Sequence, residues 1–257
     1  MSSASGLEGR HAVITGGGTG IGAAIADRLA ELGATITLMA RNRDRLVTKA
    51  DALPKAQAVA CDVTDERAVK AAFDKAVSEF GPVEILVNNA GAAPTAPFHK
   101  LSYEDWLKVL DVNLNGVFLC TRAVIEPMRQ AGGGRIVNVA STAGLIGYAY
   151  VSAYTAAKHG VVGLTKALAL ETATKGITVN AVCPGYTETE IVRGAIDNIM
   201  AKTGRSAQEA MAELTARNPQ GRLVQPEEVA AAVAWLCAED SGAVTGQSIS
   251  VSGGEVM

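Results

Sequence analysis

The sequence of 257 residues contains few aromatic side chains and few cysteines. Aromatic residues make up 4% of the chain, which argues against a binding surface built from aromatic rings. The cysteines are far apart and form no C-x-x-C pair, so we interpret them as small buried residues and not as disulfides or metal ligands. They favour a reducing compartment, and they stand at Cys61, Cys120, Cys183 and Cys237.

Long runs of one kind of residue are also absent. The formal net charge is -3 and Lys and Arg are dispersed, which argues against a nucleic-acid partner because phosphate neutralisation needs concentrated positive charge. No apolar run approaches the ~18 residues of a membrane helix. The N-terminal stretch MSSASGLEGR lacks the apolar core of a signal peptide. We therefore expect a cytoplasmic protein with no membrane partner and no metal.

The sequence does contain 48% hydrophobic residues, enough for a sizeable core. Short apolar runs alternate with longer helical patterns, and several runs, such as ITLM and RIVNVA, are continuous, as in parallel strands buried on both faces. This alternation predicts a single α/β domain over residues 1–257, with a doubly wound parallel sheet of about seven strands and helices on both faces. The expected strands are His11–Thr15, Thr35–Met39, Ala56–Ala60, Glu84–Val87, Arg135–Ala140, Thr178–Cys183 and Ser248–Val251. The expected helices are Ile21–Leu32, Asp65–Phe80, Ser102–Gln130, Ala153–Lys175 and Pro226–Ala238.

One segment, residues 187–225, interrupts the alternation. It is long, charged and punctuated by glycine, with KTGRSAQEA in its middle. A lid or substrate-binding insertion fits this pattern, and a plain surface excursion fits it equally well.

A glycine-rich loop, TGGGTGIG, follows the first expected strand and precedes a helical pattern. Glycines let the backbone approach a pyrophosphate, and a helix N-terminus supplies free N–H groups and a favourable dipole. The strict G-x-G-x-x-G is absent, although Gly18 to Ala23 fits the looser form, and no Walker loop is present. Glycines alone could make a tight connection, but their position after the first strand favours dinucleotide binding. The candidate contacts are Gly16, Gly18, Thr19, Gly20, Ile21 and Gly22.

The end of the second expected strand reads LMARNRDRL. An acidic residue there would bind the adenosine ribose of NAD, whereas an arginine would pair with the 2′-phosphate of NADP. No acid follows Met39; Ala40 and Arg41 come instead, with Arg43 close by. The sequence therefore favours NADP(H) over NAD(H), unless Arg41 only begins a solvated helix.

The stretch SAYTAAKHG places Tyr154 four residues before Lys158, so that both would project from one face of a helix that Ser152 could cap. A neighbouring ammonium lowers the pKa of a tyrosine from its usual ~10, and such a pair can exchange a proton with an alcohol or carbonyl. Any exposed helix can carry this pair, so its context decides. Ser141 ends a buried strand upstream, at the edge where open α/β sheets bind ligands, and Asn113 stands in DVNLNG.

Together these motifs resemble the short-chain dehydrogenase/reductase family, in its single-domain form with a Rossmann fold. The resemblance covers essentially the whole chain, with T-G-x-x-x-G-x-G, N-N-A-G, the Asn, Ser and Y-x-x-x-K of the active site, and P-G after the sixth strand, in the family's order and spacing. The stretch TARNPQGRLVQPEEVA looks like that of reductases acting on polyketide or 3-oxoacyl chains.

The resemblance implies a role for each catalytic residue. Tyr154 would be the general acid/base, and Lys158 would lower its pKa and bind the nicotinamide ribose. Ser141 would hold the substrate oxygen, and Asn113 would hold a water in a proton relay through Lys158.

The resemblance also implies further coenzyme contacts, while Asn88 would tie strands together. Thr19 is a departure, because NADP-preferring members often carry Arg or Lys there, so the NADP(H) preference rests on Arg41 and the missing acid. Asp62 and Val63 would lie at the adenine, Asn89, Ala90 and Gly91 at the adenosine ribose, and Pro184, Gly185, Thr187 and Thr189 at the nicotinamide side.

The implied activity is reversible hydride transfer between NADP(H) and a ketone or secondary alcohol. A 3-oxoacyl thioester or polyketide-like substrate is the first expectation, with Arg193, Lys202 or Arg205 contacting a carrier phosphate; plain solvated charge is the simpler interpretation of these three. Steroids, sugars and cyclic alcohols stay open. Candidate substrate contacts are Ala143, Leu145, Tyr148, Val151, Tyr186 and Ile191.

Two other functions fit the sequence less well. An epimerase or dehydratase of nucleotide sugars would need an added substrate domain, for which the chain is too short. A non-catalytic NADP(H) sensor would be expected to lose the tyrosine or the serine, and this chain keeps both. The resemblance further implies a homotetramer, built partly on residues 102–130 and 153–175.

Overall fold

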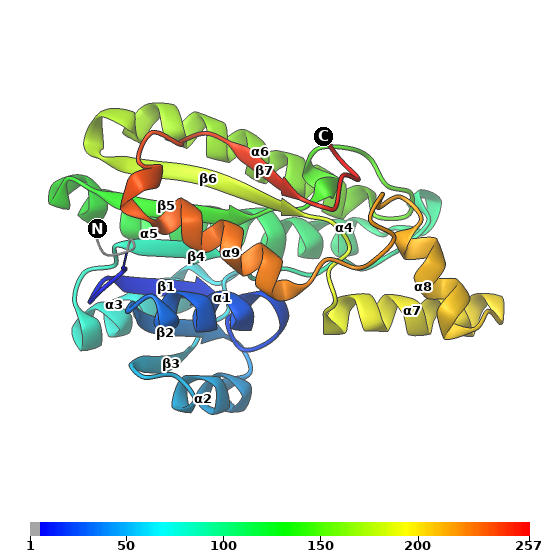
Figure 1. Ribbon diagram of the computed structural model, residues 1–257, viewed down its shortest axis with the longest axis horizontal. Coiled ribbons are helices and arrows are strands. Elements are labelled where there is room, and N and C mark those ends of the chain that lie inside the picture. Colours follow the sequence, from blue (N-terminus) through cyan, green and yellow to red (C-terminus); the bar gives the residue numbers. More distant parts are fainter. Residues whose placement is uncertain (1–5) are drawn as a thin grey trace.

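Seven parallel strands form one sheet in the computed structural model, which describes residues 6–257 (Figure 1). The spatial order is β3-β2-β1-β4-β5-β6-β7, and the strands begin and end within one residue of the expected ranges. The predicted doubly wound α/β fold is confirmed. The strands are β1 (His11–Thr15), β2 (Thr35–Ala40), β3 (Ala56–Ala60), β4 (Ile85–Asn88), β5 (Gly134–Val139), β6 (Ile177–Pro184) and β7 (Ser248–Val251).

Helices cover both faces of the sheet, which explains why its central strands are largely apolar. In β1, Ala12 and Ile14 pack into the core on one face, and Val13 packs into the core on the other. The first face is covered by α1 (Gly20–Glu31), α2 (Arg43–Asp51) and α9 (Pro226–Cys237), and the second by α3 (Glu66–Phe80), α5 (Gly116–Ala131) and α6 (Ser152–Thr172) (Figure 1).

Two helical regions differ from expectation. The single helix expected over residues 102–130 consists of α4 (Tyr103–Leu110), a π-helical turn (Asp111–Asn115) and α5. In that turn the Asn113 side chain donates to the carbonyl oxygen of Val109, which an α-helical N–H of residue 113 would otherwise approach. Helix α2 was not expected, because Leu46 and Ala50 are its only described buried residues.

The interrupting segment forms a helical hairpin beyond the carboxyl edge of the sheet (Figure 1). It contains α7 (Glu190–Thr203) and α8 (Ala207–Thr215), which enclose a small apolar cluster of their own. Its two ends are joined at the base, where Val224 N–H donates to Tyr186 and Glu188 N–H donates to Val224, both at 2.9 Å. The hairpin therefore leaves and rejoins the sheet at one point.

The four cysteines are buried free thiols, as the sequence indicated. Burial raises the pKa of Cys61 and of Cys183 to about 11, so both remain protonated at neutral pH. No helix in residues 6–257 combines the length and the apolar character needed to cross a bilayer.

Candidate active site

A cleft of about 1060 Å³ opens at the carboxyl ends of β1, β4, β5 and β6. The strand order reverses between β1 and β4, and ligands of open α/β sheets bind at such a point. The wall of the cleft includes the side of α6 that carries Tyr154 and Lys158. The predicted coenzyme and catalytic residues on its lining are Gly16, Thr19, Gly20, Ile21, Asn89, Ala90, Gly91, Ser141, Tyr154, Lys158, Pro184, Gly185, Thr187 and Thr189.

The glycine loop is held close to the loop after β4. Asn89 donates from Nδ2 to the carbonyl oxygens of Thr15 (3.0 Å) and Gly16 (3.2 Å). Gly16 has φ +66°, and a Cβ there would lie 2.8 Å from Asn89 Nδ2. A Cβ at Gly22 would collide with the Gly16 carbonyl, so the start of α1 can pack on the loop only without a side chain. The glycines at 16 and 22 are thus required by close backbone approach.

The N-terminus of α1 is left open toward the cleft. Thr19, the residue before the helix, provides no side-chain cap, and the first turn holds no acid. By contrast, Asn42, Asp65 and Thr189 cap α2, α3 and α7 with their side chains. Free N–H groups and an uncompensated dipole are what a pyrophosphate requires, so the loop fits the predicted dinucleotide.

Two arginines lie near the start of α2, where the sequence predicts a 2′-phosphate contact. Arg41 is exposed, lies ahead of α2 and not within it, and has no carboxylate at ion-pair distance in the described part of the chain. The pKa of Asp62 is lowered mainly by a hydrogen bond from the Thr64 backbone, with a smaller contribution from Arg41. Arg45 was not predicted; it pairs with Glu190 of α7 at 2.7 Å, and its Cβ lies 3.6 Å from where a Cβ of Gly18 would stand. Only the basic run RNRDR pointed to it.

Tyr154 and Lys158 are both enclosed at the base of the cleft. Lys158 is 3% exposed, its Nζ donates to Val139 at 2.8 Å, and Nζ lies 5.5 Å from the centre of the Tyr154 ring. Burial lowers the pKa of Lys158 to about 8. Burial raises the pKa of Tyr154, and a hydrogen bond with Ser141 acts in the opposite direction. The expected lowering of the Tyr154 pKa is therefore wrong for the protein alone, because desolvation outweighs the hydrogen bond.

Ser141 and Asn113 shape the site from two sides. Ser141 Oγ accepts from Ala143 N–H at 3.1 Å and caps the short turn that leads away from β5. Asn113 is fully buried; it donates to Ala92 (2.8 Å) and Val109 (3.0 Å) and accepts from Ala92 N–H (3.3 Å). A Cβ at Gly91 would lie 2.8 Å from Asn113 Oδ1. The Asn113 side chain thus supports the lining loop from behind.

The start of α6 differs from expectation. Ser152 is the first residue of the helix, not its cap, and its Oγ has no hydrogen-bond partner among residues 6–257. Val151 precedes the helix instead and lines the cleft.

The lining of the cleft is largely apolar. Ala143, Tyr148, Val151 and Tyr186 line it as predicted. Leu145 does not, because it packs against the buried cluster that includes Val161 and Val162 on α6. Ile191 lies in α7, and its side chain falls outside the described part of the structure.

Several lining residues were not predicted. The loop of residues 92–97 forms one wall, and its Ala96 N–H donates to Tyr150 at 2.8 Å. Tyr150 is exposed at this wall with φ +66°, a strained conformation that concentrates at functional sites. Of the basic residues considered for a phosphate, only Lys202 lines the cleft; Arg193 pairs with Glu188 at 3.5 Å, and Arg205 pairs with Glu213.

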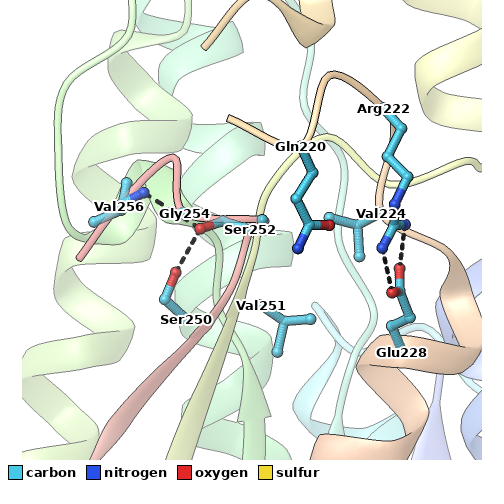
Figure 2. A pocket seen from close by; sticks show the side chains of 10 residues that line it. Gln220, Arg222, Val224, Glu228, Ser250, Val251, Ser252, Gly254 and Val256 are labelled. Atoms are coloured by element: carbon cyan, nitrogen blue, oxygen red, sulfur yellow. Dashed lines mark hydrogen bonds and ion pairs between the residues drawn. The ribbon is translucent and has the colours of Figure 1, made fainter. Parts of the chain in front are cut away.

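A smaller cavity of about 430 Å³ lies beside β7 (Figure 2). Arg222 makes two hydrogen bonds to Glu228 there, at 2.7 and 2.6 Å, and the hydroxyls of Ser250 and Ser252 bond each other at 2.8 Å (Figure 2). Its charged and hydroxyl groups therefore satisfy one another, and it contains none of the predicted site residues.

Comparison with known proteins adds to this geometry. A family model described as short chain dehydrogenase matches residues 10–200. The granaticin polyketide synthase putative ketoacyl reductase 1 of Streptomyces violaceoruber is 44% identical over 253 residues, covering 95% of this chain and 92% of the relative. The cis-4-hydroxycyclohexanecarboxylate dehydrogenase of Sinomonas cyclohexanicum is 43% identical over 249 residues, covering 95% and 96%.

The fold is also similar to a solved structure. A variant of the actinorhodin polyketide ketoreductase, crystallised with NADPH, superposes with a TM-score of 0.93 at 42% identity. The match covers 96% of this chain and 97% of that one.

Proposed function

The chain belongs to the short-chain dehydrogenase family and is an oxidoreductase of keto and CH–OH groups, and from this we propose the reaction and the residues that perform it. The reaction is reversible hydride transfer between NADP(H) and a ketone or secondary alcohol. One observation carries the proposal: a single cleft contains the glycine loop, the open N-terminus of α1, and Ser141, Tyr154 and Lys158.

Binding of the coenzyme would involve three parts of the cleft. The loop at residues 16–22 would bind the pyrophosphate, Asn89 to Gly91 the adenosine ribose, and Lys158 the nicotinamide ribose. When bound, NADPH supplies the hydride that the carbonyl carbon accepts. The protein supplies the proton and holds the carbonyl in position.

Proton transfer follows from the electrostatics of Tyr154. Burial raises its pKa, so at neutral pH it is a phenol and can donate to the carbonyl oxygen. The Ser141 hydroxyl would hydrogen-bond the same oxygen and polarise it. As the proton leaves, the phenolate would be stabilised by the nearby Lys158 ammonium, which is largely charged at pH 7 because its pKa is about 8.

We propose NADP(H) as the preferred coenzyme. Arg41 supports this, since it is exposed and has no ion-pair partner within residues 6–257, and no acid follows β2. The related ketoreductase crystallised with NADPH supports it as well.

The substrate we propose is a 3-oxoacyl thioester or a polyketide-like ketone. The apolar wall suits a hydrocarbon chain, and Lys202 offers a cation at the same cleft for a carrier or coenzyme A phosphate. The hairpin of residues 187–225 would act as a lid, because α7 provides part of the wall. The relative that oxidises a hydroxycyclohexanecarboxylate makes a cyclic ketone the alternative to test.

The test is NADPH oxidation with acetoacetyl-CoA and with 4-oxocyclohexanecarboxylate. We expect turnover of the thioester, and Tyr154→Phe should lower kcat by about 100-fold or more while leaving NADPH affinity unchanged. Tyr103→Phe, at an exposed tyrosine of α4, is the matched control and should be fully active.

Two results would count against the proposal. Full turnover by Tyr154→Phe would remove Tyr154 from the reaction. Tight NADPH binding by the parent protein without reduction of either ketone would favour a non-catalytic sensor.

A further inference from the structure

The chain ends in a tight turn after β7 that is fixed from within. Gly253 and Gly254 take φ +63° and +94°, which reverses the chain. Ser252 then accepts two hydrogen bonds, from Glu255 N–H to its carbonyl (3.2 Å) and from Val256 N–H to its Oγ (3.3 Å). Figure 2 shows the second of these, together with the bond between Ser252 and Ser250. The backbone of Glu255 is therefore held in place.

The turn is wedged between two parts of the molecule. On one side, Gly253 lies so close to Asn218 Oδ1 that a Cβ would collide with it, and a Cβ of Gly254 would lie 3.2 Å from Pro219. On the other side, a Cβ of Gly185 in the cleft wall would lie 2.9 Å from Glu255 Oε2. The last residues thus bridge the base of the α7–α8 hairpin and the wall of the cleft.

Glu255 binds the tip of Tyr148 from this position. The Tyr148 hydroxyl lies 2.6 Å from Glu255 Oε1 and 2.8 Å from Thr142 Oγ1. A phenol has one proton, and a carboxylate is the stronger acceptor, so Tyr148 donates to Glu255 and accepts from Thr142. The hydroxyl has no further proton to offer the substrate side of the cleft.

The Tyr148 ring is held by two more groups. The Arg217 guanidinium stands over it at 5.4 Å, and the Tyr186 ring meets it edge-on at 6.3 Å. Tyr148, Thr142 and Tyr186 all line the cleft, whereas Glu255 is absent from its lining. Glu255 therefore does not line the cleft itself, and its hydrogen bond to Tyr148 connects it to the lining.

We propose that Glu255 is a positioning residue that locks the Tyr148 ring as one wall of the substrate cleft and so determines which ketones bind. This inference rests on the proposed function, because it assumes that the apolar end of the cleft receives the ketone. With its hydroxyl occupied, Tyr148 offers ring carbons to the ligand, which favours an apolar chain or ring over a polar one. Burial and the hydrogen bond with Glu255 also raise the pKa of Tyr148, so it keeps its proton.

The kinetic test compares Glu255→Ala, Glu255→Gln and Tyr148→Phe on acetoacetyl-CoA and 4-oxocyclohexanecarboxylate. We expect Glu255→Ala to raise KM for the thioester about tenfold, the value of a hydrogen bond to a charged group, and to leave kcat and KM for NADPH within about twofold. Glu255→Gln keeps an acceptor at the same place and should restore most of the affinity. Glu227→Ala, an exposed glutamate in the first turn of α9, is the control and should change nothing.

A double variant, Tyr148→Phe with Glu255→Ala, distinguishes a positioning role from a general loss of stability. If Glu255 acts through Tyr148, Tyr148→Phe combined with Glu255→Ala should be no worse than Tyr148→Phe alone. The inference would be overturned if the effects of the two substitutions on KM were fully additive, or if Glu255→Ala left KM for the thioester unchanged. It would also be overturned if Glu255→Ala weakened NADPH binding as much as thioester binding.

A crystal structure of Glu255→Ala tests the same point without turnover. The Tyr148 hydroxyl should leave hydrogen-bonding distance of Thr142, while β7 and α6 stay in place. An unmoved Tyr148 would refute the positioning role even if the parent protein reduced neither ketone. A protein that is inactive on both ketones but shows the displaced ring would contradict only the proposed substrate.

Discussion

Lys158 is the side chain at which burial and chemistry conflict most directly. The residue is 3% exposed, and its ammonium has one described hydrogen bond, to Val139. Burial moves its pKa from 10.5 to about 8. A base with a folded pKa below its unfolded pKa binds fewer protons when folded, so it costs stability below pH 8, and the cost fades between pH 8 and 10.5.

Replacing Lys158 by methionine should therefore stabilise the protein while abolishing its activity. Removal of the buried charge should stabilise the protein by about 3 kcal/mol, and loss of the hydrogen bond to Val139 should cost about 1 kcal/mol. The free energy of unfolding at pH 7 should therefore rise by about 2 kcal/mol. Urea unfolding at pH 7 and at pH 10 measures this, and the advantage of Lys158→Met should shrink at the higher pH. A variant less stable than the parent at pH 7 would contradict the electrostatic argument.

Arg41 is the residue on which the coenzyme preference depends. Arg41→Asp places a carboxylate where a 2′-phosphate would bind, so kcat/KM with NADPH should fall by about 10- to 100-fold and kcat/KM with NADH should hold or rise. Steady-state kinetics with each coenzyme measures the ratio. Arg43→Asp, two residues away, makes the same change in net charge and serves as the control.

The residues of the cleft show which contacts a sequence can and cannot reveal. Ser141, Tyr154 and Lys158 line the same cleft, because Ser141 follows a strand and the other two lie on a helix, and periodicity locates both elements. The pKa of Tyr154 was predicted in the wrong direction, since the sequence does not tell how deeply a residue is buried. The bond between Tyr148 and Glu255 joins positions 107 residues apart with no motif around Glu255, so only the folded chain reveals it.

At the scale of elements, the π-helical turn at Asp111–Asn115 is the most informative feature of the helical layers. Its buried Asn113 side chain joins Val109 of α4 to Ala92 in the loop that lines the cleft. The turn thus connects the shape of a helix to the shape of the site. A long helical pattern such as residues 102–130 does not by itself reveal such a turn, because one extra residue shifts the phase of the apolar stripe at a single point and keeps the same period on either side.

Asn113→Ala should destabilise both α4 and the loop that contains Ala92. It leaves the buried carbonyl of Val109 and the part-buried backbone groups of Ala92 without partners, so we expect a loss of about 3 kcal/mol in the free energy of unfolding and a raised KM for NADPH. Asn115→Ala, two residues on, removes only an exposed bond to Asp111 and should cost less than about 1 kcal/mol. Urea unfolding of the two variants compares them, and equal losses would show that Asn113 has no special role.

The elements of the fold were predicted with unequal success. The seven strands were found almost to the residue, because most of them are short apolar runs bounded by polar segments. Helix α2 has a single apolar stripe of two described buried residues, and α7 and α8 pack on each other outside the main cores, so neither region had a strong pattern. The use of residues 187–225 as a lid stays a prediction.

At the scale of the whole molecule, three exposed apolar side chains lie on α4, α5 and α6. Leu107 of α4, Phe118 of α5 and Leu170 of α6 are 39%, 47% and 83% exposed. The homotetramer implied by the family resemblance would use these same helices. We therefore propose that these side chains are covered by other copies of the chain.

Light scattering tests the assembly directly. The parent protein should have four times the mass of one chain, and Leu170→Glu should shift it to smaller species because it would bury an unpaired charge. Val77→Glu, at a partly exposed position on α3 outside those helices, is the control and should leave the mass unchanged. A monomeric parent protein would refute the proposed assembly.

The closed base of the α7–α8 hairpin has a consequence for how this protein can diversify. Because Tyr186 and Glu188 are bonded to Val224, the polypeptide between them forms a cassette whose two ends meet at one fixed joint. The length and composition of this segment can change without moving β6 or α9. Ser141, Tyr154 and Lys158 lie outside the segment, so they would stay in place. Exchange of this segment between relatives would therefore change the substrate specificity and leave the catalytic residues in place. Both evolution and recombination in the laboratory could use this route.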